Sequence, residues 1–81
     1  MIGTVSDFTA EALFASNLQA SQQPTTAQAW EAVTEAVTRY GAQGFSGRLA
    51  TAYGDCPETA VARMAWCRGL AAALAAQPAA P

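Results

Sequence analysis

The stretch from Leu49 to Trp66 constrains the fold more than any other part of this chain. Its letters, LATAYGDCPETAVARMAW, predict the end of one helix, a tight turn at Gly54-Asp55 and the start of a second helix. Gly54 suits a helix end because glycine adopts backbone conformations that other residues avoid. Asp55, followed three residues later by Glu58, has the spacing of a capping box, with Pro57 tolerated in the first turn. We therefore expect two helices that meet at a corner.

The remaining residues predict an all-α fold, a small bundle of four helices over about 9–19, 25–40, 43–53 and 56–77. The clearest of these begins with a capping-box pair, Thr25 and Gln28, and stops at Gly41. One face of it carries the large apolar side chains Trp30, Val33, Val37 and Tyr40. We expect a single helical domain over residues 1–77 and a disordered tail at 78–81.

The chain of 81 residues lies near the lower size limit for a domain that is stabilised by its own core. Hydrophobic residues make up 52% of it, but many are alanines, which bury little area each. A core of this size is often completed by a partner or by a second copy, so we expect a protein partner or a homo-oligomer.

Charge is sparse, with six acidic residues, four basic residues and a net charge of −2. This balance disfavours nucleic acid as a partner and anionic membrane surfaces as a docking site. No run approaches the roughly 20 apolar residues that span a bilayer, and the start lacks the pattern of a signal peptide. The expected location is the cytoplasm.

The sequence contains no histidine, which excludes Ser-His-Asp and Cys-His catalytic arrangements and histidine-ligated metals. The glycines lack the lysine and preceding strand of a phosphate-binding loop. Glu31 and Glu35 form a carboxylate pair on what we expect to be a solvated helix face. We therefore predict a non-enzymatic protein with no cofactor and no metal.

Cys56 and Cys67 would lie about 16 Å apart on one helix, too far for a mutual disulfide. They fall on the same helical face, which favours two reduced, buried cysteines. The alternative is a reactive thiol or intermolecular disulfide at Cys56, at the start of the helix, where the helix dipole favours a thiolate.

The predicted fourth helix is apolar nearly all round. Its core face would consist of Cys56, Ala60, Met64, Cys67, Ala71 and Leu74, and Trp66 lies about 100° or more away from that face. A helix of this kind is normally buried on more than one side. We predict a protein interface at Trp66, Leu70, Val61 and Ala73, with the alternative that the N-terminal segment folds back over Trp66.

The corner stretch 49–66 also resembles the helix-turn-helix of bacterial transcription regulators. The matching residues are Leu49-Ala50 and Tyr53-Gly54 in the first helix and its turn, and Thr59, Ala60 and Met64 in the second. The resemblance implies DNA contacts from Thr59 and Arg63, with Arg48 nearby. It departs at Asp55, where an apolar turn residue is usual. The whole chain also resembles short, alanine-rich helical proteins of actinobacteria, a likeness that implies no activity.

Three functional hypotheses follow. The first is a small, non-enzymatic protein–protein interaction module, acting as an accessory or regulatory subunit or as a homo-oligomer, that uses the apolar fourth helix. The second is a helix-turn-helix DNA-binding regulator. The third is a thiol-linked dimer or redox sensor through Cys56.

Overall fold

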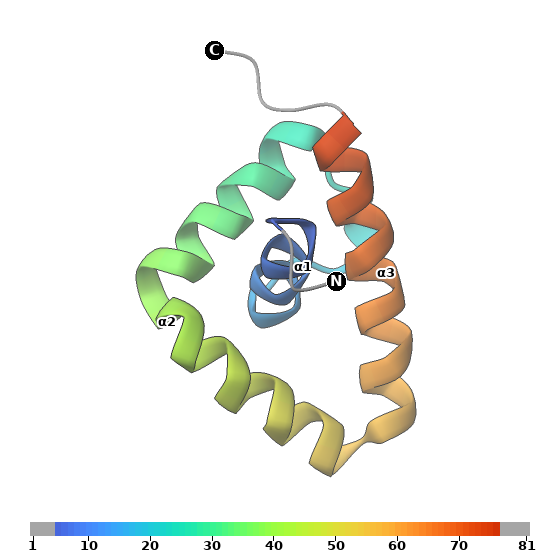
Figure 1. The fold of residues 1–81 in the computed structure, drawn as a ribbon. Coiled ribbons are helices and arrows are strands. Elements are labelled where there is room, and N and C mark those ends of the chain that lie inside the picture. Colours follow the sequence, from blue (N-terminus) through green and yellow to red (C-terminus); the bar gives the residue numbers. More distant parts are fainter. Residues whose placement is uncertain (1–4, 77–81) are drawn as a thin grey trace.

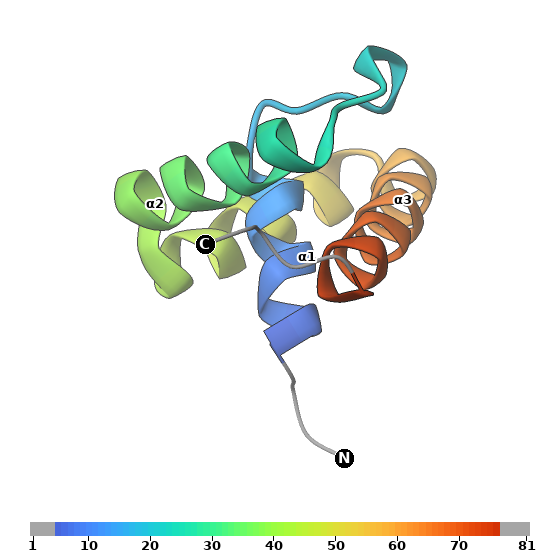
Figure 2. The same ribbon diagram turned by 90° about the horizontal axis from the view of Figure 1, so that it is seen from above.

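The structure, a computed structural model, describes residues 5–76, and the helices found in this range confirm the all-α class. Helix α1 spans Val5–Ala15, the short 3-10 helix η1 spans Ala20–Gln22, α2 spans Thr26–Asp55 and α3 spans Pro57–Ala76. The two long helices form a frame around α1, which passes between them (Figures 1 and 2). The predicted disordered tail at 78–81 lies outside the described residues.

The prediction of four helices is wrong, because the described residues form three α-helices. The segments expected as separate helices, 25–40 and 43–53, belong to one 30-residue helix, α2. This helix bends at Gly41, which has φ 68° and ψ 174°. Such a backbone conformation is nearly exclusive to glycine, so Gly41 turns the chain without a connecting loop. The predicted helix end is therefore a bend within α2 (Figure 1).

The beginning of α2 confirms the capping box. The backbone N–H of Gln28 donates to Oγ1 of Thr25 at 3.1 Å, and the N–H of Thr25 donates to Oε1 of Gln28 at 2.9 Å. Each side chain thus satisfies a backbone donor that the first turn of a helix leaves without a partner.

The corner between α2 and α3 is sharper than the sequence predicted. Cys56 alone separates the helices: its N–H donates to the carbonyl of Ala52 at 3.0 Å, and its own carbonyl accepts from the N–H of Ala60 at 3.0 Å. The turn predicted at Gly54-Asp55 is thus displaced, since both residues lie within α2 and Asp55 does not precede α3 directly.

Helix α1 is the central element of the fold. It occupies residues 5–15 rather than the predicted 9–19. Its buried residues are nearly consecutive: Thr9, Ala10, Ala12, Leu13, Phe14 and Ala15. They are buried on several sides because both α2 and α3 pack against this helix.

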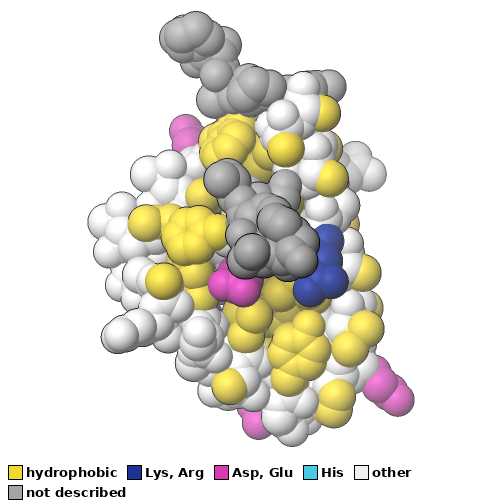
Figure 3. Space-filling view, viewed as in Figure 1, with side chains coloured by type: hydrophobic (Ala, Val, Ile, Leu, Met, Phe, Trp, Pro, Cys, Tyr) yellow, Lys and Arg dark blue, Asp and Glu magenta, His cyan; other side chains and the backbone are white. Residues whose placement is uncertain are grey.

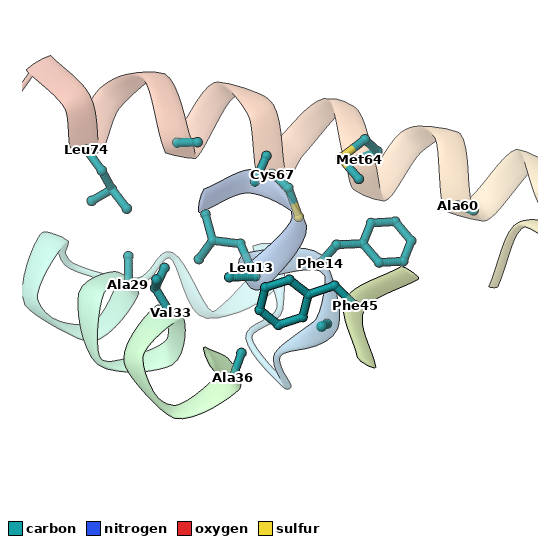
Figure 4. Close-up of a cluster of buried hydrophobic side chains, with 14 residues drawn as sticks. Leu13, Phe14, Ala29, Val33, Ala36, Phe45, Ala60, Met64, Cys67 and Leu74 are labelled. Carbon is teal, nitrogen blue, oxygen red and sulfur yellow. The ribbon is translucent and has the colours of Figure 1, made fainter. Parts of the chain in front are cut away.

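All three helices contribute to one hydrophobic core (Figure 4). Its largest fully buried side chains are Phe45, Leu13, Leu74 and Cys67. The core face predicted for the fourth helix is confirmed for Ala60, Met64, Cys67, Ala71 and Leu74, whereas Cys56 is exposed.

Candidate functional site

The C-terminal end of α1 presents backbone carbonyls that have no partner within the helix. The last four carbonyls of any α-helix are left in this state, and they carry the negative end of the helix dipole. Here no glycine follows the last residue, and no basic residue lies in the last turn. The N–H of Ser16 donates to the carbonyls of Ala12 and Leu13 at 3.0 and 3.2 Å, and its hydroxyl donates to that of Leu13 at 2.6 Å, so the carbonyls of Phe14 and Ala15 need donors from elsewhere.

Arg63 of α3 supplies donors to Phe14 and to the loop that follows α1. Its Nε donates to the carbonyl of Phe14 at 3.2 Å, and its Nη1 donates to that of Leu18 at 2.9 Å. Its Nη2 reaches the carbonyls of Leu13, Phe14 and Ser16 at 3.1, 3.1 and 3.0 Å. One guanidinium thus binds two carbonyls of the last turn of α1 and two of the loop that follows it, which fixes this end of α1 to α3.

Arg48 of α2 adds a second link to the same helix end. Its Nε donates to the carbonyl of Ala15 at 3.2 Å, and its Cζ lies 4.3 Å from the centre of the Tyr40 ring. The ring and the carbonyl together hold the guanidinium in place. Within the described residues, neither Arg48 nor Arg63 pairs with a carboxylate.

A hollow of about 840 Å³ opens to solvent beside these two arginines, inside the corner of α2 and α3. Its lining comes from the end of α1 and the following loop (Phe14, Ser16, Asn17, Gln19), from α2 (Tyr40, Gly44, Gly47, Arg48, Thr51, Ala52, Asp55), and from Cys56, Thr59, Ala60 and Arg63. We call it the corner hollow. It combines an apolar floor with polar and charged walls, which is the usual make-up of a ligand site.

The structure brings together all the residues proposed to contact DNA. Thr59, Arg63 and Arg48 line the corner hollow, and Cys56 lies there with them. However, they line a concave surface, whereas a recognition helix must project into a groove of the duplex. The guanidinium of Arg63 also donates its hydrogen bonds to backbone carbonyls of α1 and the following loop, so it does not present these donors to a ligand outside the protein.

The four residues predicted as a protein interface do not share one side of α3. Trp66 and Leu70 are half-buried and pack against the core, whereas Ala73 and Val61 are exposed, Val61 to 59%. At 3.6 residues per turn, Val61 lies about 140° from Trp66 and about 180° from Leu70 around the helix. Arg63 lies 5.9 Å from the Trp66 ring and flanks it on the side of α1.

The two cysteines differ in environment, so the expectation that both are buried is wrong for Cys56. Cys56 is exposed, with its Sγ 3.3 Å from Oγ1 of Thr59. Cys67 is fully buried, and the loss of solvation raises the pKa of its thiol from 9.0 to about 11, partly opposed by the charge of Arg63.

Sequence reasoning missed the role of Arg63, because it considered the fourth helix by itself. The available signal was one of two arginines on a largely apolar helix, together with a first helix that lacks a glycine end. Neither feature shows which helix end the arginine reaches.

No cluster of histidine, cysteine or acidic side chains suited to a metal occurs among the described residues. None of the helices within residues 5–76 has the length and apolar character needed to cross a membrane. No protein-family model, curated protein or solved structure matches this chain.

Proposed function

We propose that this chain is a small, non-enzymatic protein–protein interaction module and that its contact surface is the side of α3 facing away from the core. We call this surface the outer face of α3. It consists of Val61, Ala62, Ala65, Gly69, Ala72, Ala73 and Ala76, all of which are exposed.

The observation that carries the proposal is the scarcity of charge on this face: its seven residues are uncharged, Glu58 lies at its N-terminal end, and Arg68 lies at its edge, about 20° from Val61. Solvent-facing sides of helices normally carry charged and polar residues. Here Arg63 turns inward to the carbonyls of α1, which leaves Arg68 as the sole exposed charge on α3 between Val61 and Ala76. On the α3 side of the molecule in Figure 3, separate hydrophobic side chains lie among white atoms, with one basic group beside them and an acidic group at the lower end.

The small side chains of the outer face suit contact with another helix. Alanine and glycine let two helix backbones approach at the short end of the usual 8–10 Å spacing. A second copy of the chain fits this surface, because its seven residues are uncharged and the two charges at its margins, Glu58 and Arg68, have opposite signs. Trp66 and Leu70 border the face and would be covered at the edge of such a contact.

The test is the molar mass in solution, measured by light scattering after size exclusion over a range of protein concentrations. We expect the wild-type chain to dimerise and Ala65→Glu, in the middle of the outer face, to remain monomeric. Ala50→Glu is the matched control, because Ala50 is an exposed alanine on α2. A wild-type chain that is monomeric at all concentrations, and indistinguishable from Ala65→Glu, would overturn pairing with a second copy.

The same variants test the accessory-subunit form of the proposal. There the outer face binds a different protein, so Ala65→Glu should release a co-purifying partner that Ala50→Glu retains. Loss of the partner from both variants alike would argue against the outer face.

A further inference from the structure

The corner hollow has the size and the charge of a ligand site. Its volume of about 840 Å³ lies within the roughly 300–1,000 Å³ that is typical of small-molecule pockets. It lies inside the corner, lined by the second part of α2 and the start of α3, and is separate from the outer face of α3. We propose that it binds a small organic anion with a flat apolar body.

Arg48 is the group that would hold the anionic end. Its Nε is fixed on the carbonyl of Ala15, and its guanidinium lies over the Tyr40 ring, so its orientation is set before any ligand arrives. Its two Nη atoms make no hydrogen bond within the described residues. A guanidinium held in this way offers a two-pronged donor that matches a carboxylate or sulfonate.

The charge balance of the hollow also favours an anion. Arg48 and Arg63 both line it, and neither has a carboxylate partner among the described residues. Asp55 is the one carboxylate in the lining. The lining therefore carries two positive charges against one negative charge, in a chain whose net charge is −2.

The floor of the hollow favours a flat apolar body. Its apolar lining is Ala52, which is half-buried, and the small exposed parts of Phe14 and Ala60, 6% and 3% of each residue. Phe14 is held by the Tyr53 ring, which stacks on it with centroids 5.9 Å apart and an interplanar angle of 10°. An apolar floor beside a positively charged wall is suited to an anion with an apolar body more than to a sugar or a cation.

The test compares two fluorescent probes that share an aromatic body and differ in charge. The anionic probe is 8-anilinonaphthalene-1-sulfonate, and its neutral counterpart is N-phenyl-1-naphthylamine. We expect the full chain to bind the anionic probe more tightly. Arg48→Gln should weaken binding of the anionic probe by about tenfold, in line with loss of a charge-assisted hydrogen bond, and leave the neutral probe nearly unchanged.

Two further variants decide between the hollow and a general charge effect. Arg68→Gln removes one positive charge from α3 outside the lining and should leave binding of both probes unchanged. Gly47→Leu fills the hollow, because a Cβ at Gly47 meets no atom within 4 Å, and it should block both probes while keeping the helix intact. Circular dichroism of each variant checks that it is folded.

The proposal is overturned if Arg48→Gln and Arg68→Gln weaken binding of the anionic probe equally, because the effect would then be one of net charge. It is also overturned if Gly47→Leu binds both probes as the wild type does. It is overturned as well if binding of the anionic probe follows the monomer fraction measured by light scattering. A second copy of the chain would then occupy the hollow.

Discussion

The guanidinium of Arg63 binds the carbonyl of Phe14 through two nitrogens, Nε at 3.2 Å and Nη2 at 3.1 Å, across 49 residues of sequence. The same side chain is 5.4 Å from the centre of the Phe14 ring. One residue of α3 thus contacts both the backbone and the side chain of a core residue in α1. The contact replaces the glycine or basic residue that usually completes the end of a helix.

Arg63→Ala should destabilise the fold strongly. The substitution removes five hydrogen bonds and leaves partly buried carbonyls without donors. Each unsatisfied buried group costs about 1–3 kcal/mol, so a total loss of roughly 3–5 kcal/mol in the free energy of unfolding is expected. Urea denaturation followed by circular dichroism measures this loss.

Arg63→Lys should recover a small part of the stability that Arg63→Ala loses, because an ammonium group is a compact donor without the planar fork of arginine. The matched control is Arg68→Ala, an exposed arginine of the same helix, which should change stability by less than about 0.5 kcal/mol. Equal stability of Arg63→Ala and Arg68→Ala would contradict the assigned role.

The second prediction concerns the bend in α2 and compares two glycines: one has a backbone conformation that requires glycine, and the other does not. Gly41 has a positive φ that side chains resist, so Gly41→Ala should destabilise the protein by about 1–3 kcal/mol. Gly69 lies in a regular part of α3, where a Cβ meets no atom within 4 Å. Gly69→Ala should therefore stabilise the protein, by up to about 1 kcal/mol. Thermal unfolding of both variants tests the pair, and a tolerated Gly41→Ala would show that the bend is not required.

The sequence was sufficient for the local features of this fold. The capping box at Thr25 and Gln28 and the buried stripe of α3 follow from spacing alone. The four-helix prediction failed because a glycine after a regular helix fits either a helix end or a bend. Only the packing of α2 against the other two helices selects the bend at Gly41.

Features that depend on contacts between residues far apart in the sequence could not be predicted from local spacing. Residues 8–15 are apolar at most positions, which is the pattern of a helix enclosed by neighbours, but it resembles irregular patterning when the neighbours are unknown. The corner hollow depends on Arg48 and Arg63, which are separated in sequence and converge only because both bind the end of α1. Such convergence has no local signature.

A third prediction concerns thiol reactivity. Cys56 is exposed at the corner and Cys67 is fully buried. Iodoacetamide should therefore modify Cys56 in the folded protein and reach Cys67 only after unfolding. Peptide mass mapping with and without urea measures the difference. Mild oxidation followed by non-reducing electrophoresis tests the thiol-linked dimer, which Cys56→Ser should abolish and Cys67→Ser should retain.

The last prediction is a loss of stability in alkaline solution. Burial raises the pKa of the Cys67 thiol to about 11 from 9.0, so the folded state favours the neutral thiol. In the unfolded chain this thiol ionises at lower pH, and the unfolded state then binds fewer protons than the folded state. Stability should therefore be intact below pH 9 and fall between pH 9 and pH 11, by about 2–3 kcal/mol at most. Urea denaturation at several pH values measures the slope. Cys67→Ala is the control that separates this thiol from every other group in the chain, and an unchanged slope in that variant would contradict the prediction.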